Sequence, residues 1–125
     1  VFDGAALIAA QGVVRQMPVG ETVVELILDL VRACRPDGDE APEVVRKSVA
    51  WGPGPRAAQA LMLTVRARAL LDGRLAPSPE DVAALARPVL GHRMALSFAA
   101  RAEGAVLERV IDEVTERVTR VGLAA

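Results

Sequence analysis

Apolar residues recur at helical spacing along most of this 125-residue chain, and no other feature constrains its fold as strongly. In the segment 21–35, for example, valine, isoleucine and leucine fall on one face, while acidic residues and Arg32 fall on the other. Proline and glycine interrupt the pattern at short intervals, as at Pro18 and Gly20. The pattern predicts short amphipathic helices joined by short loops.

The expected helix boundaries follow from residues that favour helix ends. Asp3 and Ser78 suit N-caps, and Gly73 suits a C-terminal stop. Segment 43–48 is compatible with one helical turn or with an extended stretch, and segment 92–98 is expected to be an irregular connector. No strand hairpin is indicated. The helices are expected at about 3–16, 21–35, 55–72, 78–90 and 105–121.

These elements predict a single all-α domain over residues 1–125, a compact bundle of about five short helices. Leu7, Ile8 and Val14 of the first helix are expected to point into its core. The last helix is expected to place one apolar stripe on the core, made of Val106, Val110, Ile111, Val114, Val118 and Val121.

Composition argues against several classes of function. The net charge is −1, the sequence pI is about 5.9 and aromatic residues make up 2%, so neither electrostatics nor base stacking favours binding to nucleic acid or to an anionic membrane. No apolar run approaches the roughly 18 residues of a membrane-spanning helix. The single cysteine, Cys34, cannot form an internal disulfide, which suits a reducing compartment, so we expect a cytoplasmic protein.

The chain is unusually apolar for a free-standing domain. Hydrophobic residues make up 52% of it and the mean hydropathy is +0.30. It also begins at Val1 rather than at a methionine. We therefore expect a fragment of a larger protein, with one face that docks on the rest of that protein.

Side chains that could carry out catalysis or bind a metal are few. One histidine and one cysteine cannot supply a Cys/His zinc site. His92 lies just after an expected helix end, where hydrogen bonding to the terminal carbonyls is favoured over catalysis. Lys47-Ser48 lacks the preceding glycines of a phosphate-binding loop. Several arginines are expected to be solvated surface, because they fall on different helix faces and are offset by acids: Arg46, Arg56, Arg66, Arg68, Arg74 and Arg87.

Residues 52–57 read Gly-Pro-Gly-Pro-Arg-Ala and lead directly into an apolar helix. Pro55 suits the first helical position, where its missing N–H costs nothing. Arg56 then lies in the first turn, near the positive end of the helix dipole, which disfavours a cation. Its guanidinium either reaches forward to an anion, together with the free N–H groups of the helix start, or swings away as a surface arginine.

The order of several short motifs resembles one protein family. Residues 52–57 look like the Gly-Ala-Ser-Pro-Arg-Ala signature of the MoxR family of AAA+ ATPases, and Leu-Asp-Leu-Val-Arg-Ala-Cys-Arg at 28–35 looks like a helix of the family's lid. The signature is followed by Ala-Leu-Leu-Asp-Gly-Arg at 69–74, Pro-Ser-Pro-Glu-Asp-Val at 77–82 and Pro-Val-Leu-Gly-His-Arg at 88–93. This succession resembles the C-terminal helical lid of MoxR-like ATPases over about residues 3–113.

The resemblance implies an AAA+ lid domain whose upstream P-loop domain binds ATP and Mg²⁺. It gives Arg56 the role of the sensor-2 arginine, which contacts the γ-phosphate of ATP in cis or in trans, and it places Gly52, Gly54 and Pro55 beside that nucleotide. The parent protein is implied to assemble as a ring of neighbouring subunits and to couple ATP hydrolysis to chaperone-like remodelling of clients, often with a von Willebrand factor A domain partner. Residues 1–125 lack Walker A, Walker B and an arginine finger, so the chain alone is expected to need no cofactor and to hydrolyse no ATP.

The chain departs from the family signature at Pro53 and Gly54, where alanine and serine are usual, so the hydroxyl that could cap the helix is missing. Trp51 before them is also unusual and is expected to pack on the nucleotide-binding domain. Three other hypotheses remain: a stand-alone helical protein-interaction module in which Arg56 has no role, the lid of another AAA+ clade such as magnesium chelatase-like subunits, and a helix-turn-helix DNA-binding domain, which the acidic pI disfavours.

Overall fold

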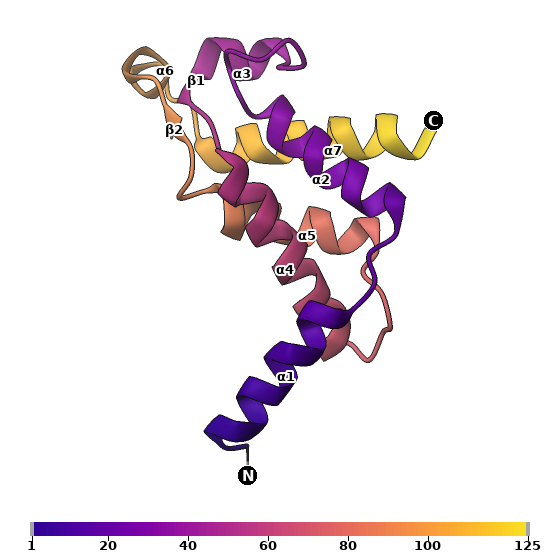
Figure 1. Cartoon of the computed structure of the whole chain (residues 1–125). Helices are drawn as coiled ribbons and strands as arrows, with labels where there is room; N and C mark the ends of the chain where they lie inside the picture. The colour runs from indigo at the N-terminus through magenta and orange to yellow at the C-terminus, as the bar shows by residue number, and fades with distance from the viewer. Residues whose placement is uncertain (1, 125) are drawn as a thin grey trace.

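The computed structural model describes residues 2–124, which contain seven helices and one small antiparallel sheet (Figure 1). The predicted helical fold class is therefore confirmed, with short helices in addition to those expected. No helix in this part of the chain is long and apolar enough to cross a membrane. The elements in chain order are α1 (Gly4–Gln16), α2 (Glu21–Ala33), α3 (Glu43–Ser48), β1 (Val49–Trp51), α4 (Pro55–Leu71), α5 (Pro79–Leu90), β2 (Ala95–Leu96), α6 (Phe98–Ala102) and α7 (Leu107–Ala124).

The long helices begin and end where the sequence favours it. At the start of α1, Asp3 Oδ1 accepts a hydrogen bond from the Ala6 N–H at 2.8 Å. At the start of α5, the Ser78 N–H donates to Asp81 Oδ2 at 2.7 Å as part of a capping box. Gly73 follows the end of α4 with a φ of +75°, a conformation that favours glycine. The predicted caps and the predicted stop are confirmed.

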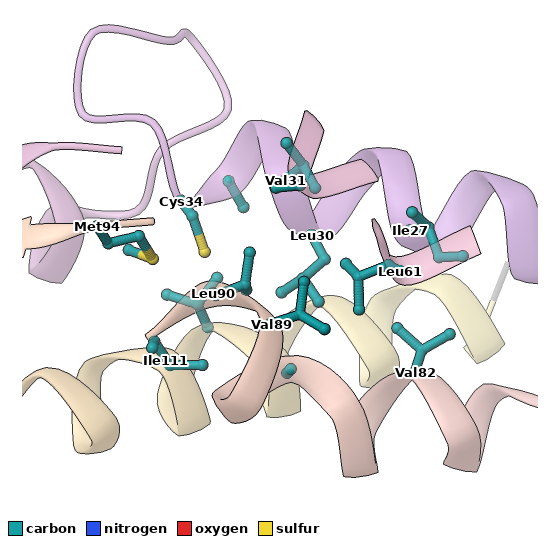
Figure 2. Close-up of a cluster of buried hydrophobic side chains, with 14 of the residues drawn as sticks. Ile27, Leu30, Val31, Cys34, Leu61, Val82, Val89, Leu90, Met94 and Ile111 are labelled. Carbon is teal, nitrogen blue, oxygen red and sulfur yellow. The ribbon is translucent and has the colours of Figure 1, made fainter. Parts of the chain in front are cut away.

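The hydrophobic core lies where α2, α4, α5 and α7 pack together (Figure 2). Burying one large aliphatic side chain stabilises a fold by roughly 1.5–3 kcal/mol, so these contacts dominate the stability of the domain. The largest fully buried apolar side chains come from all four helices and from α3: Ile27 and Leu30, Leu61 and Val65, Val82 and Leu90, Ile111 and Val114, and Val45 of α3.

Helix α1 extends away from the other helices and lies beside α4 (Figure 1). Val14 is buried as predicted, but Leu7 is 49% exposed and Ile8 is 70% exposed, so the prediction for these two residues was wrong. The inward line of α1 instead runs through the half-buried Ala6 and Ala10 to Val14. At roughly 100° per residue, the two positions after Ala6 turn away from this line.

Helix α7 buries only the middle of its predicted stripe. Val110, Ile111 and Val114 are buried, and Val118 packs partly against the core. Val106 and Val121 are exposed, so the prediction was wrong at both ends. Val106 precedes the first residue of α7, and Val121 lies in the last turn of that helix.

Two short segments were missed by the sequence analysis. β1 pairs antiparallel with β2, with Val49 opposite Leu96 and Trp51 opposite Ala95, and the Ser97 N–H donates to the Ser48 carbonyl oxygen at 2.8 Å. The connector at 92–98 therefore contains a strand and leads into α6. Strands of two or three residues are too short to show an alternating pattern, which explains the omission. Segment 43–48 is helical.

A buried carboxylate joins α5 to the end of α4. Asp81 is 1% exposed, and Arg74 binds it in a bidentate manner at 2.7 and 2.6 Å, while Arg68 approaches at 3.2 Å. These hydrogen bonds from Arg74 and the Ser78 N–H lower the pKa of Asp81 to about 2, against burial, which raises it. The cluster fixes the loop between the two helices.

The low pKa of Asp81 predicts a specific pH dependence of stability. Because the folded-state pKa lies below the unfolded value, the carboxylate contributes stability above pH 4 that is lost as the pH falls from about 4 to about 2. We expect Asp81→Asn to lower the free energy of unfolding at pH 7 by up to about 2 kcal/mol, since both arginines are half-exposed and solvent screens part of the interaction. Urea unfolding measured from pH 7 to pH 2 checks this.

The difference between wild type and Asp81→Asn should shrink over that acidic interval. Asp37→Asn serves as a control, because Asp37 is exposed and forms no ion pair among residues 2–124. A difference that stays constant down to pH 2 would contradict the assigned role of Asp81.

Candidate functional site

The segment between β1 and α4 is pressed against the end of α2. A Cβ atom on Gly52 would lie 2.4 Å from the carbonyl oxygen of Cys34 and 2.9 Å from the Cα atom of Arg35. No side chain fits there, so glycine is required by the close approach of two backbones. Pro53 is fully buried next to it. These two residues attach the beginning of α4 to the C-terminus of α2.

The first turn of α4 has an open end. Gly54 occupies the N-cap position in extended conformation, and no side chain caps the helix there. Pro55 takes the first helical position, as predicted, and the Ala57 N–H donates to the Gly54 carbonyl oxygen at 3.0 Å. A Cβ atom on Gly54 would meet nothing within 4 Å. The site would therefore accept the serine that the family signature has at this position.

Arg56 projects from this turn into solvent. It is exposed, whereas Ala57 beside it is fully buried and anchors the helix in the core. Within residues 2–124, no hydrogen bond or ion pair holds its guanidinium. The side chain is thus available to an anion at the positive end of the α4 dipole.

The predicted site residues form one continuous turn. The structure brings Gly52, Gly54, Pro55 and Arg56 together at the junction of β1 and α4. Trp51 precedes them and is 56% exposed. The described residues contain no group of three His, Cys, Asp or Glu side chains that could hold a metal ion.

Two predicted roles need correction. His92 was expected to bond the terminal carbonyls of α5, but Arg93 does so instead, donating to the Val89 carbonyl oxygen at 2.8 Å, and His92 contacts the Arg93 guanidinium. Of the six arginines expected to be solvated surface, four are exposed as expected, but Arg66 and Arg74 are partly buried and Arg74 is held by Asp81. Arg46 is among the exposed ones, and it also donates to backbone carbonyls of the loop before α3. The sequence did contain an indication of this role of Arg46. The loop before α3 is rich in turn residues, and turns leave backbone carbonyl oxygens that need hydrogen-bond donors.

Cys34 lies directly beneath the glycine of the junction. Its side chain is fully buried, and burial raises the pKa of its thiol to about 12. The thiol is therefore protonated at neutral pH and serves as a small apolar group at the end of α2.

Residues 42–116 match the model of the AAA lid domain family, which is more than half of the chain. The chain belongs to this family. The matched part contains the junction, Arg56, α4, α5 and the core half of α7. The predicted AAA+ lid architecture is confirmed, with α1 and α2 preceding the matched part.

A curated relative places the lid among MoxR-like proteins, and the solved structure of an ATPase resembles it. The chain is 30% identical over 118 residues to the chaperone MoxR1 of Mycobacterium tuberculosis, covering 94% of this chain and 31% of the relative. It is also similar to the crystal structure of a candidate ATPase from Cytophaga hutchinsonii, with a TM-score of 0.78 and 27% identity over 84% of this chain and 32% of that one. The chain thus spans about a third of the length of each, and it is a lid domain of the MoxR-like AAA+ type.

The two glycines of the lid junction give a matched pair of substitutions. We expect Gly52→Ser to lower the free energy of unfolding by about 1–3 kcal/mol, because its Cβ would overlap the backbone of α2. We expect Gly54→Ser to raise it by a few tenths of a kcal/mol, roughly the advantage of serine over glycine as an N-cap. Urea unfolding of both variants measures the difference, and equal effects at the two positions would contradict the described junction.

Proposed function

We propose that this lid closes on ATP bound by a P-loop domain upstream in the same protein, and that Arg56 contacts the γ-phosphate. The observation that carries the proposal is the exposed guanidinium in the first turn of α4, which has no hydrogen-bond or ion-pair partner within residues 2–124. An arginine is disfavoured at the positive end of a helix dipole unless an anion compensates it. The planar guanidinium of arginine pairs well with a phosphate group, so the terminal phosphate of ATP supplies that compensation.

The proposed contact links chemistry to motion. A guanidinium on the γ-phosphate stabilises the negative charge that spreads over its oxygens during transfer. When the γ-phosphate leaves, the lid loses an attractive contact and its preferred angle changes. Arg56 lies three residues after Pro53, which is buried in the body of the lid, so a shift at the phosphate is passed to the whole domain. The phosphate belongs to the same subunit or to its neighbour in a ring.

The cofactors fit this chain only in part. Arg56 and the open end of α4 suit the phosphate of ATP, whereas the part of the lid that the structure describes has no metal-binding cluster. We therefore assign Mg²⁺ to the P-loop domain, where it would neutralise phosphate charge when bound. The lid's own contribution is to bind and orient the terminal phosphate.

We further propose that the whole protein is a cytoplasmic, ring-forming ATPase that remodels client proteins, with a von Willebrand factor A domain protein as one partner. Two facts support this proposal. The chain spans about a third of two relatives, which leaves room for a nucleotide-binding domain, and one of them is a chaperone.

Turnover by the intact protein tests the role of Arg56. We expect Arg56→Ala to lower the turnover number at least about tenfold while nucleotide binding largely survives, because a charge-stabilising donor at the transferred phosphate is lost. Arg109→Ala is a matched control, since Arg109 is an exposed arginine in the first turn of α7 whose guanidinium has no partner within residues 2–124. Steady-state ATPase assays with both variants give the comparison.

Unchanged turnover in Arg56→Ala would refute the proposed contact. The lid would then be a helical docking module, and the junction would have a structural role without contacting nucleotide.

The isolated 125-residue chain gives a separate prediction. We expect no ATP turnover from it above the buffer background, because it contains no Walker A or Walker B motif. Phosphate release measured with the purified chain checks this. Turnover that co-purifies with the chain would contradict the proposal that hydrolysis requires the upstream P-loop domain.

A further inference from the structure

One arginine of α3 holds together the loop that follows α2. Arg46 Nε donates to the Ala41 carbonyl oxygen at 3.0 Å, and its Nη2 donates to the carbonyl oxygens of Asp39 at 3.2 Å and Gly38 at 3.3 Å. A planar guanidinium can serve several acceptors at once, which a lysine cannot do with equal geometry. Among the described residues, Arg46 is the one whose side chain donates hydrogen bonds to the carbonyl oxygens of this loop.

The braced loop continues into the end of α2. The Ala41 N–H donates to the Gly38 carbonyl oxygen at 3.3 Å, and the Gly38 N–H donates to the Arg35 carbonyl oxygen at 3.1 Å. Arg35, with Cys34, forms the backbone against which Gly52 is pressed. A sequence of direct contacts therefore leads from Arg46 to the junction that begins α4.

A second route connects the same parts. α3 passes directly into β1, and β1 ends at Trp51, immediately before Gly52. β1 is in turn held by its pairing with β2. Arg46 thus belongs to a short unit that contacts the junction from both sides, through the loop and through the strand. Displacement of the loop would change the surface on which Gly52 rests.

We propose that Arg46 is a positioning residue for Arg56. By fixing the loop against the end of α2, it sets the place and direction of the first turn of α4, and so the reach of the Arg56 guanidinium. The proposal rests on the proposed function, since it requires that Arg56 contacts a phosphate. A misplacement of about 1 Å is enough to reduce a rate by up to a hundredfold, so an indirect brace has a measurable effect.

A double-mutant cycle in the intact protein tests this. We expect Arg46→Ala to lower the turnover number about three- to tenfold, with ATP affinity nearly unchanged and the melting temperature lowered by less than about 5 °C. In the Arg56→Ala background, the same substitution should change turnover by less than about twofold, because the group that it positions is already absent. Lys47→Ala is the matched control: it removes the neighbouring cation of α3, which pairs only with Glu43 among the described residues, and should leave turnover within about twofold.

Equal loss of turnover from Arg46→Ala in both backgrounds would overturn the proposal, since Arg46 would then act independently of Arg56. So would unchanged turnover in the otherwise wild-type protein. If Arg46→Ala does not fold, Arg46→Lys replaces it in the same cycle, because the ammonium keeps the charge but not the forked contacts. The single variant Arg56→Ala separately reports on the proposed function, so the two failures are distinguishable.

Discussion

The contact between the backbone of Gly52 and the end of α2 is the constraint on which the rest of the site depends. No side chain separates the two segments, so the start of α4 cannot move relative to α2 without losing direct van der Waals contact. Pro53 is buried beside this contact, and Pro55 restricts the backbone of the first helical turn. Arg56 is therefore carried by a rigid support while its guanidinium remains in solvent. A side chain that senses a ligand benefits from both properties.

The long helices could be predicted from sequence because their signals are local. Asp3, Ser78 and Gly73 act on backbone groups within a few residues, and the apolar period of α2 or α5 needs no knowledge of the partner helix. Exposure is different, because it depends on what covers a face. Leu7 and Ile8 are apolar, yet α4 covers another side of α1. The local sequence pattern does not indicate which side of α1 is covered.

The site divides in the same way. Pro55 and Arg56 could be placed at a helix start from the sequence, and the motif order pointed to the lid family that the comparisons then established. The sequence does not show why position 52 must be glycine. The backbone that excludes a side chain there belongs to Cys34, eighteen positions earlier in the chain. The carbonyls bound by Arg46 belong to a loop whose path is set by tertiary packing. Interactions of this kind appear only when the helices are assembled.

The most direct test of the central claim is a structure of the intact protein with a non-hydrolysable ATP analogue and Mg²⁺. We expect an Arg56 guanidinium nitrogen at about 3 Å from a γ-phosphate oxygen, with the nucleotide bound by the same subunit or by its neighbour. We also expect Gly52 to keep its contact with the end of α2 in that state. An Arg56 side chain that stays in solvent while the nucleotide is fully bound would contradict the account, and the lid would then act without sensing the phosphate.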